Sequence, residues 1–145
     1  MKNNCDYFFE IALKEAQKAF DKNEVPVGAV IIKNNKILSK AHNKKEELKN
    51  VFSHAEILAI KKASKKIGDW RLKDCIMFVT LKPCSMCLSA IQQSRINKVF
   101  YILEDEFLED NNYSEKLIKI NNFSLEKKIK LMVKNFFVNC RKKVV

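Results

Sequence analysis

The sequence of 145 residues contains only two glycines and two prolines. This scarcity excludes collagen-like, linker-rich and other low-complexity architectures, which depend on these two residues. No apolar run approaches the roughly 20 residues that a membrane-spanning helix needs. The N-terminal stretch MKNNCDYFFE also lacks the apolar region of a secretory signal. We therefore expect a chain of mostly regular structure that does not associate with a membrane.

The sequence lacks the even number of cysteines that a complete disulfide framework needs. It contains five, so at least one thiol is left unpaired. A reducing compartment, the cytoplasm, is the expected location. Hydrophobic residues make up 47% of the chain, which is ample for a core. This length and composition favour a single domain over residues 1–145.

Acidic residues are scarce relative to basic ones. Lysine and arginine total 28 against 17 aspartate and glutamate residues, which leaves a net charge of +11. Such an excess favours a polyanionic partner, because cations that neutralise phosphates release counterions. A generally lysine-rich composition could supply part of the excess, so charge alone does not establish nucleic-acid binding.

Hydrophobic periodicity predicts alternating helices and strands. The expected elements are a helix over 6–22, a hairpin that turns at Asn34-Asn35, a helix over 54–66, a strand over 75–81, a helix over 85–94, a strand over 98–103, a weakly marked strand over 117–120, and a C-terminal helix. Gly68 is the expected stop of the second helix, and Ser124 is the expected N-cap of the last. Strands joined through helices indicate right-handed crossovers and a partly parallel sheet with helices packed against it.

Three candidate metal ligands stand out: His54 in the triplet HAE, and Cys84 and Cys87 in PCSMC. Two thiolates and one imidazole suit zinc, and three protein ligands leave the fourth tetrahedral position open for water, as in catalytic sites. Both motifs fall at predicted helix N-termini, where the helix dipole favours a thiolate. Glu56, two residues after the histidine, lies about 200° further round a helix, so it can reach a bound water without being a ligand. These positions predict a general acid/base beside a zinc site.

Each motif alone is weak, since a lone CxxC also occurs in redox pairs or by chance and HxE is commonplace. Their conjunction is specific, because HAE at one helix start and PCxxC at the next match the signature of zinc-dependent nucleobase deaminases. In these enzymes hydroxide attacks C6 of adenine or C4 of cytosine. The spacing does not choose between the two bases.

Beyond this signature, the sequence resembles the bacterial tRNA-specific adenosine deaminases of the cytidine-deaminase-like superfamily. The matching segments are EVPVGAV (24–30), HN (42–43), HAEILAI (54–60), DWRL (69–72), FVTLKPCSMC (78–87), SRINKVFY (94–101) and NFFVNCR (135–141). The resemblance implies a three-layer α-β-α cytidine-deaminase-like fold of the α/β class, with a central mixed sheet of about five strands flanked by helices. It also implies one zinc ion bound by His54, Cys84 and Cys87, proton transfer by Glu56, and contact between Asn43 and the target nucleoside. The implied reaction converts adenosine to inosine at the wobble position of a tRNA anticodon, usually in a homodimer.

One segment departs from the family pattern. Members commonly follow the fourth strand with a Gly/Ala-rich turn, whereas residues 104–112 here read EDEFLEDNN. The departure affects the rim of the site and the choice of substrate rather than the zinc chemistry.

Further residues are candidates for substrate binding. The backbone N–H near Ala55 or Cys84 and the carbonyl before Pro83 are placed to orient a substrate. Phe137 and Arg141, four residues apart on the last helix, could present a stacking and phosphate-binding ridge to an anticodon stem-loop. The neighbouring Phe136 lies on the predicted apolar face and is expected in the core.

Two other functions are compatible with these residues. One is a small-molecule deaminase of cytosine, guanine or a nucleoside, which needs the same zinc site but no phosphate-binding surface. The other is a noncatalytic, zinc-stabilised nucleic-acid-binding module, in which protein ligands would fill all four coordination positions. The charge of +11 favours RNA over a small molecule, and the finding of only three ligands disfavours the noncatalytic module.

Overall fold

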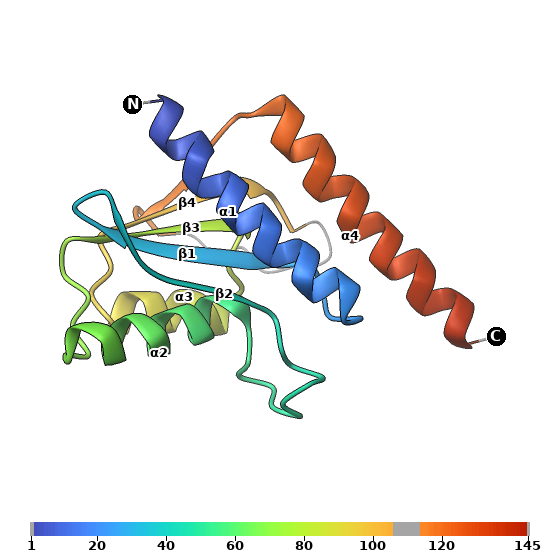
Figure 1. Cartoon of the computed structure of the whole chain (residues 1–145), viewed down its shortest axis with the longest axis horizontal. Helices are drawn as coiled ribbons and strands as arrows, with labels where there is room; N and C mark the ends of the chain where they lie inside the picture. Colours follow the sequence, from blue (N-terminus) through green and yellow to red (C-terminus); the bar gives the residue numbers. More distant parts are fainter. Residues whose placement is uncertain (1, 106–113, 145) are drawn as a thin grey trace.

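The computed structural model describes residues 2–105 and 114–144 (Figure 1). Most of the atypical segment 104–112 therefore lies outside the described residues. The elements in chain order are α1 (Lys2–Asp21), β1 (Gly28–Lys33), β2 (Lys36–His42), α2 (Ala55–Ile67), β3 (Cys75–Leu81), α3 (Ser85–Gln93), β4 (Lys98–Leu103), β5 (Leu117–Lys119) and α4 (Phe123–Val144). None of the described helices is long and apolar enough to cross a membrane.

The strands form one mixed sheet in the order β2-β1-β3-β4-β5. β1 is antiparallel to both of its neighbours, whereas β3, β4 and β5 are parallel to one another. Because β1 lies between β2 and β3, those two strands point in the same direction, and each of α2 and α3 connects strands of the same direction. The expected α/β fold with a five-stranded mixed sheet is confirmed.

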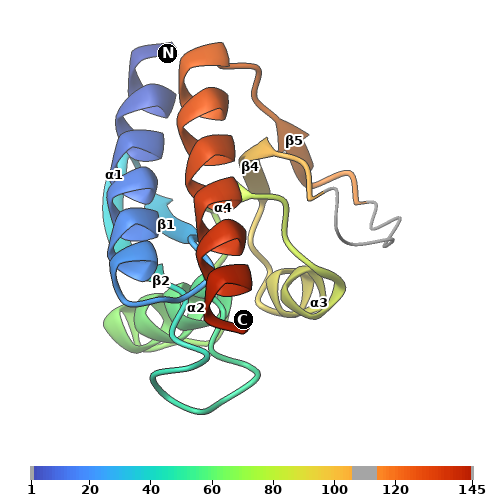
Figure 2. The same cartoon turned by 90° about the vertical axis from the view of Figure 1, so that its right-hand side faces the viewer.

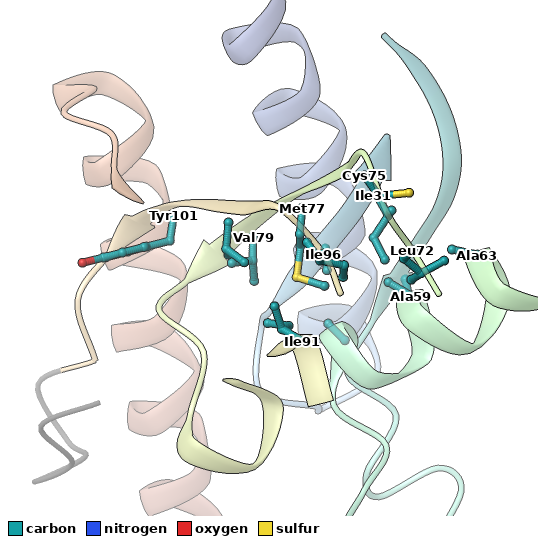
Figure 3. Packing of buried hydrophobic residues seen from close by; sticks show 14 of the residues in the cluster. Ile31, Ala59, Ala63, Leu72, Cys75, Met77, Val79, Ile91, Ile96 and Tyr101 are labelled. Atoms are coloured by element: carbon teal, nitrogen blue, oxygen red, sulfur yellow. The ribbon is translucent and has the colours of Figure 1, made fainter. Parts of the chain in front are cut away.

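Helices cover both faces of the sheet, so the expected three layers are present. Figure 2 shows α1 and α4 side by side on one face, with α2 and α3 on the other. Alternate side chains of each strand serve the two faces. Ile31, Met77 and Val79 pack against α2 and α3 (Figure 3), whereas Val30 and Phe78 pack against α1 and α4.

Local turn chemistry matches the sequence predictions. Asn34 and Asn35 have φ values of 51° and 62°, the left-handed pair that a tight hairpin turn requires. Gly68 ends α2 at φ 73°, where its N–H donates to the carbonyl of Ser64 at 2.9 Å. Both predicted boundaries are confirmed.

The N-cap of α4 and the face that this helix buries differ from the sequence predictions. Its N-cap is Asn122, whose side-chain oxygen accepts the N–H of Leu125 at 3.1 Å, so Ser124 lies inside the first turn. The buried stripe of the helix continues through Val133 to Phe137, which packs against the core. Phe136 is only half-buried and lies one position off this stripe. The expectation that Phe136 belongs to the core was therefore wrong.

The topology gathers the chemically interesting segments at one edge of the sheet. β2, β3 and β4 all end at this edge, and α2 and α3 both begin there. The ends of β2 and β3 therefore lie close to the start of the helix that follows each strand. This edge carries both predicted ligand motifs.

Candidate active site

The N-termini of α2 and α3 bring the three predicted ligands together. His54 and Cys84 are the N-cap residues of these helices, and neither side chain caps its own helix. The Nδ1 atom of His54 lies 3.4 Å from the Sγ atom of Cys87 and 3.7 Å from that of Cys84. The imidazole and both sulfur atoms are thus free to face a common centre.

These three side chains fit a metal ion. Their donor atoms all lie within 4.8 Å of one another, and they are the one such group of three among the residues that the structure describes. Zinc bonds of about 2.0–2.3 Å place tetrahedral ligands about 3.3–3.8 Å apart, close to the separations of His54 from the two cysteines. One imidazole and two sulfur ligands are a set that zinc prefers. The group therefore could hold a zinc-sized cation and leave one coordination position open.

The two thiols have shifted pKa values that bear on metal binding. Hydrogen bonds with the Cys87 thiol and with His54 together lower the pKa of Cys84 to about 4, against the opposing effect of burial. The same shared proton raises the pKa of Cys87. Cys84 is therefore a thiolate at neutral pH, and Cys87 is the thiol that would release a proton on metal binding. The positive ends of the two helices favour both thiolates.

Glu56 lies beside this group at the second position of α2. Its side chain is 4% exposed, and burial raises its pKa to about 7, although its own backbone N–H and the nearby His54 act in the opposite direction. A carboxyl group with a pKa near 7 can both accept and donate a proton near neutral pH. Its environment is that of a general acid/base rather than of a surface carboxylate.

A cavity of about 610 Å³ opens over this group. This volume lies within the range of small-molecule sites and suits one nucleoside-sized ligand. α4 forms the wall opposite the two helix starts. The lining residues are Val25, Val27, Asn43, Lys45, His54, Glu56, Leu81, Lys82, Cys84, Leu103, Glu104, Asp105, Lys130, Val133, Lys134, Phe137, Val138 and Arg141.

Asn43 is buried and lines the cavity, next to the start of α2. Its side-chain oxygen accepts the N–H of Ala55 at 2.7 Å, so the amide NH₂ is the group left to donate to a ligand. The Ala55 N–H, a candidate substrate donor from the sequence, is thereby already donated to Asn43. Pro83 is buried between Lys82 and Cys84, which do line the cavity.

Phe137 and Arg141, which the sequence predicts as a ridge for an anticodon stem-loop, both line the cavity. Phe137 is half-buried against the core, whereas Arg141 is exposed. Sequence reasoning missed Lys130 and Lys134 on the same wall. Residues 130, 134, 137 and 141 follow one another at helical spacings of four, three and four, so they share one face of α4, but only the packing of α4 places this face on the cavity.

Glu104 and Asp105, the first two residues of the atypical segment expected at the rim of the site, line the cavity. Glu104 accepts a hydrogen bond from the Tyr101 hydroxyl at 2.7 Å and lies 3.6 Å from the ammonium group of Lys82. Both residues follow β4 directly, at the edge where β3 also ends. The neighbouring ends of two parallel strands would have predicted this position.

At two helix starts the site has a His/Cys/Cys group that could hold one cation, and a buried carboxyl group lies beside it. On a three-layer α/β fold this combination defines a nucleobase or nucleoside deaminase. The chain belongs to the MafB19-like deaminase family, whose sequence profile matches residues 3–141.

Curated relatives carry a more specific name. The tRNA-specific adenosine deaminase of Aquifex aeolicus (strain VF5) is 50% identical over 101 residues, which are 70% of this chain and 67% of the relative. That of Rickettsia bellii (strain RML369-C) is 51% identical over 65% of this chain and 66% of its own. That of Streptococcus pyogenes serotype M18 (strain MGAS8232) is 46% identical over 66% of this chain. The match spans 60% of the Streptococcus protein, so part of that relative lies outside it.

Solved structures share the fold. One, from a study of A-to-I editing by tRNA:A34 deaminases at the wobble position of transfer RNA, is 31% identical with a TM-score of 0.72, and the match covers 79% of this chain and 97% of that one. Guanine deaminase from Bacillus subtilis is 36% identical with a TM-score of 0.65, over 68% of this chain and 64% of that one.

Proposed function

We propose that this chain hydrolytically deaminates adenosine to inosine at the wobble position of a tRNA anticodon. The observation that carries the proposal is the cavity itself, which combines a His/Cys/Cys group and a buried carboxyl on its floor with a cationic helix as its wall. The names of the curated relatives support the same substrate. In this proposal residues 1–145 act as one catalytic domain.

The proposed cofactor is one Zn²⁺ ion per chain, held by His54, Cys84 and Cys87. When bound, zinc would act as a Lewis acid that lowers the pKa of a water molecule, so that the hydroxide nucleophile forms near neutral pH. Glu56 takes the proton from this water and delivers it to the ring nitrogen next to C6 of adenine. It then transfers the second proton to the departing amine. The net reaction consumes one water, forms the C6 carbonyl and releases ammonia.

Positioning of the target base falls to Asn43. Its oxygen is fixed by the Ala55 N–H and the residue lines the cavity, so we assign its NH₂ group as a donor that needs no further side-chain ordering. Such a preorganised donor costs little to align with a nucleoside oxygen or ring nitrogen. Pro83 fixes the backbone between Lys82 and Cys84, so the carbonyl before it stays at the rim.

The wall formed by α4 supports RNA as the substrate. Lys130, Lys134 and Arg141 supply positive charge along the cavity, and Phe137 lies between them. Phosphate contacts orient a nucleic acid and aromatic rings stack its splayed bases. We assign these residues to binding of the anticodon stem-loop.

Two further proposals concern the protein in the cell. We place it in the cytoplasm, supported by five free cysteines, none of which is in a disulfide in the described structure. We also propose a homodimer, which the resemblance to the tRNA-specific adenosine deaminases supports.

A deaminase of free bases is the competing function, and the likeness to guanine deaminase favours it. Ammonia release separates the two when the pure, zinc-loaded chain is given guanine, cytosine, adenosine, cytidine, and anticodon stem-loops with A, C or G at the wobble position. We expect turnover of the A stem-loop alone. Efficient turnover of a free base with none of the stem-loop would contradict the proposal.

A further inference from the structure

A second charged surface lies at the edge of the sheet opposite the cavity. β2, β3 and β4 begin at this edge, and α2 and α3 end there. Three segments meet at this edge: 33–36 in the β1–β2 turn, 65–74 after α2, and 95–98 before β4. In Figure 1 the turn and the end of α2 lie on the left, and the C-terminus of α4 lies on the right. We call these three segments the distal patch.

Direct contacts join the three segments. Lys33 is paired with Cys75, so the hairpin turn lies beside the start of β3. The N–H of Leu72 donates to the Ser94 carbonyl at 2.7 Å, and that of Asp74 donates to the Asn97 side chain at 3.2 Å. Leu72 is fully buried beneath them. The patch is therefore a continuous surface held by strand pairing and hydrogen bonds rather than three independent loops.

The distal patch is strongly basic. It has eight cationic residues and two acidic ones, a surplus of six out of a net charge of +11 for the chain. The cations are Lys33, Lys36, Lys65, Lys66, Arg71, Lys73, Arg95 and Lys98, and the acids are Asp69 and Asp74. All of these residues are exposed except Lys33, which is half-buried. More than half of the charge excess is thus at the end of the molecule that the active site does not use.

Little of this charge is neutralised within the chain. Of the ion pairs in the described residues, only Arg71–Asp69, at 3.2 Å, belongs to the patch. Trp70 adds an aromatic surface that is 52% exposed. The guanidinium carbons of Arg71 and Arg95 lie 4.4 and 5.9 Å from the centre of its ring. Exposed basic side chains around an exposed aromatic ring are typical of a nucleic-acid-binding surface.

We propose that the distal patch binds the phosphate backbone of the tRNA outside the anticodon loop. The proposal rests on the proposed function, because a tRNA whose wobble base enters the cavity also brings phosphates to other parts of the domain. α2 has 13 residues from the cavity edge to the patch, which corresponds to about 20 Å. A phosphate backbone that leaves the cavity could therefore reach the patch. The patch adds affinity for whole tRNA that a short hairpin cannot gain.

The test combines Lys36→Ala, Lys66→Ala and Lys73→Ala in one variant. Its affinity is measured for full-length tRNA and for a hairpin that carries only the anticodon loop and a few closing base pairs. For full-length tRNA we expect at least a tenfold weaker Kd and a salt slope that is smaller by roughly 2 to 3, since each lost contact removes about 0.7 to 0.9. Hairpin affinity and kcat should not change, because no cavity residue is altered.

A matched control changes Lys14, Lys119 and Lys128 to alanine, which removes the same charge from exposed positions outside the patch. This control should bind tRNA like the parent, and the triple Lys→Arg variant of the patch should retain binding. Unchanged tRNA affinity, or an equal loss for tRNA and hairpin, would overturn the proposal. Loss of binding to phosphatidylserine vesicles with unchanged tRNA affinity would instead assign the patch to a membrane. If the parent makes no inosine but the patch variant loses tRNA affinity, only the proposed activity fails.

Discussion

Asn43 shows how one side chain connects the fold to the site. Its oxygen accepts the N–H of Ala55 and so satisfies a backbone donor at the start of α2. The same bond leaves the NH₂ group of this cavity-lining residue to donate to a ligand. Cys84 differs, because it is the N-cap residue of α3 but its thiol makes no capping hydrogen bond and is left for a ligand. Asn43 therefore cannot be exchanged without affecting structure and chemistry together, whereas Cys84 can be.

Cys84→Ala should remove the metal. The thiolate supplies one of three donor groups, so metal analysis should fall from about one zinc per chain to a small fraction of that. Cys140→Ala is the matched control, because this exposed cysteine lies on α4 outside the group. Retention of a full zinc ion by folded Cys84→Ala protein would disprove the proposed site.

The two glycines show how differently one residue type acts in two elements. A Cβ atom on Gly28 would lie 1.9 Å from the Ala12 carbonyl oxygen and 2.7 Å from the Ala16 nitrogen, so β1 and α1 touch backbone to backbone there. Gly68 has open space around it and needs only the left-handed backbone at φ +73°. The first is required by packing and the second by the helix end.

Gly28→Ala should therefore destabilise the protein more than Gly68→Ala. We expect a loss of about 3 kcal/mol in the free energy of unfolding for Gly28→Ala, at the upper end of overpacking costs. Gly68→Ala should lose about 1 kcal/mol, the cost of a left-handed non-glycine residue. Urea denaturation of the two variants measures both values. The reverse order would show that α1 can move away from β1 at little cost.

Elements with strong local signals could be predicted from the sequence, and β3 and β4 were predicted to the residue. The N-cap of α4 was not, because Asn122 and Ser124 are both good caps and only the tertiary position selects one. The antiparallel pairing of β1 with β3 is non-local, so no local pattern predicted it. Phe136 and Phe137 differ by one position, which helical periodicity alone does not resolve.

The candidate site also has one part that the sequence predicts and one part that it does not. His54, Glu56, Cys84 and Cys87 could be predicted because two short motifs at helix starts carry all four. The cavity wall could not, since it depends on how α4 packs across the edge of the sheet. Lys130 and Lys134 become cavity residues only through that packing.

At the scale of the whole molecule, the cavity and the distal patch lie at opposite ends of one sheet. The carboxyl ends of the parallel strands carry the metal-binding group and the cavity, and the amino ends carry the distal patch. α2 connects the two, beginning next to His54 and ending in the patch. A substrate much longer than a nucleoside is the ligand that could use both ends.

The measurement that tests the central claim most directly is nucleoside analysis of a tRNA with adenosine at the wobble position after incubation with the pure chain. We predict conversion of that one adenosine to inosine, and a rate about 10²- to 10⁴-fold lower for zinc-loaded Glu56→Ala protein, because this carboxyl group carries the proton transfers. No inosine from the parent chain, or an equal rate from the Glu56→Ala variant with its zinc retained, would contradict the account.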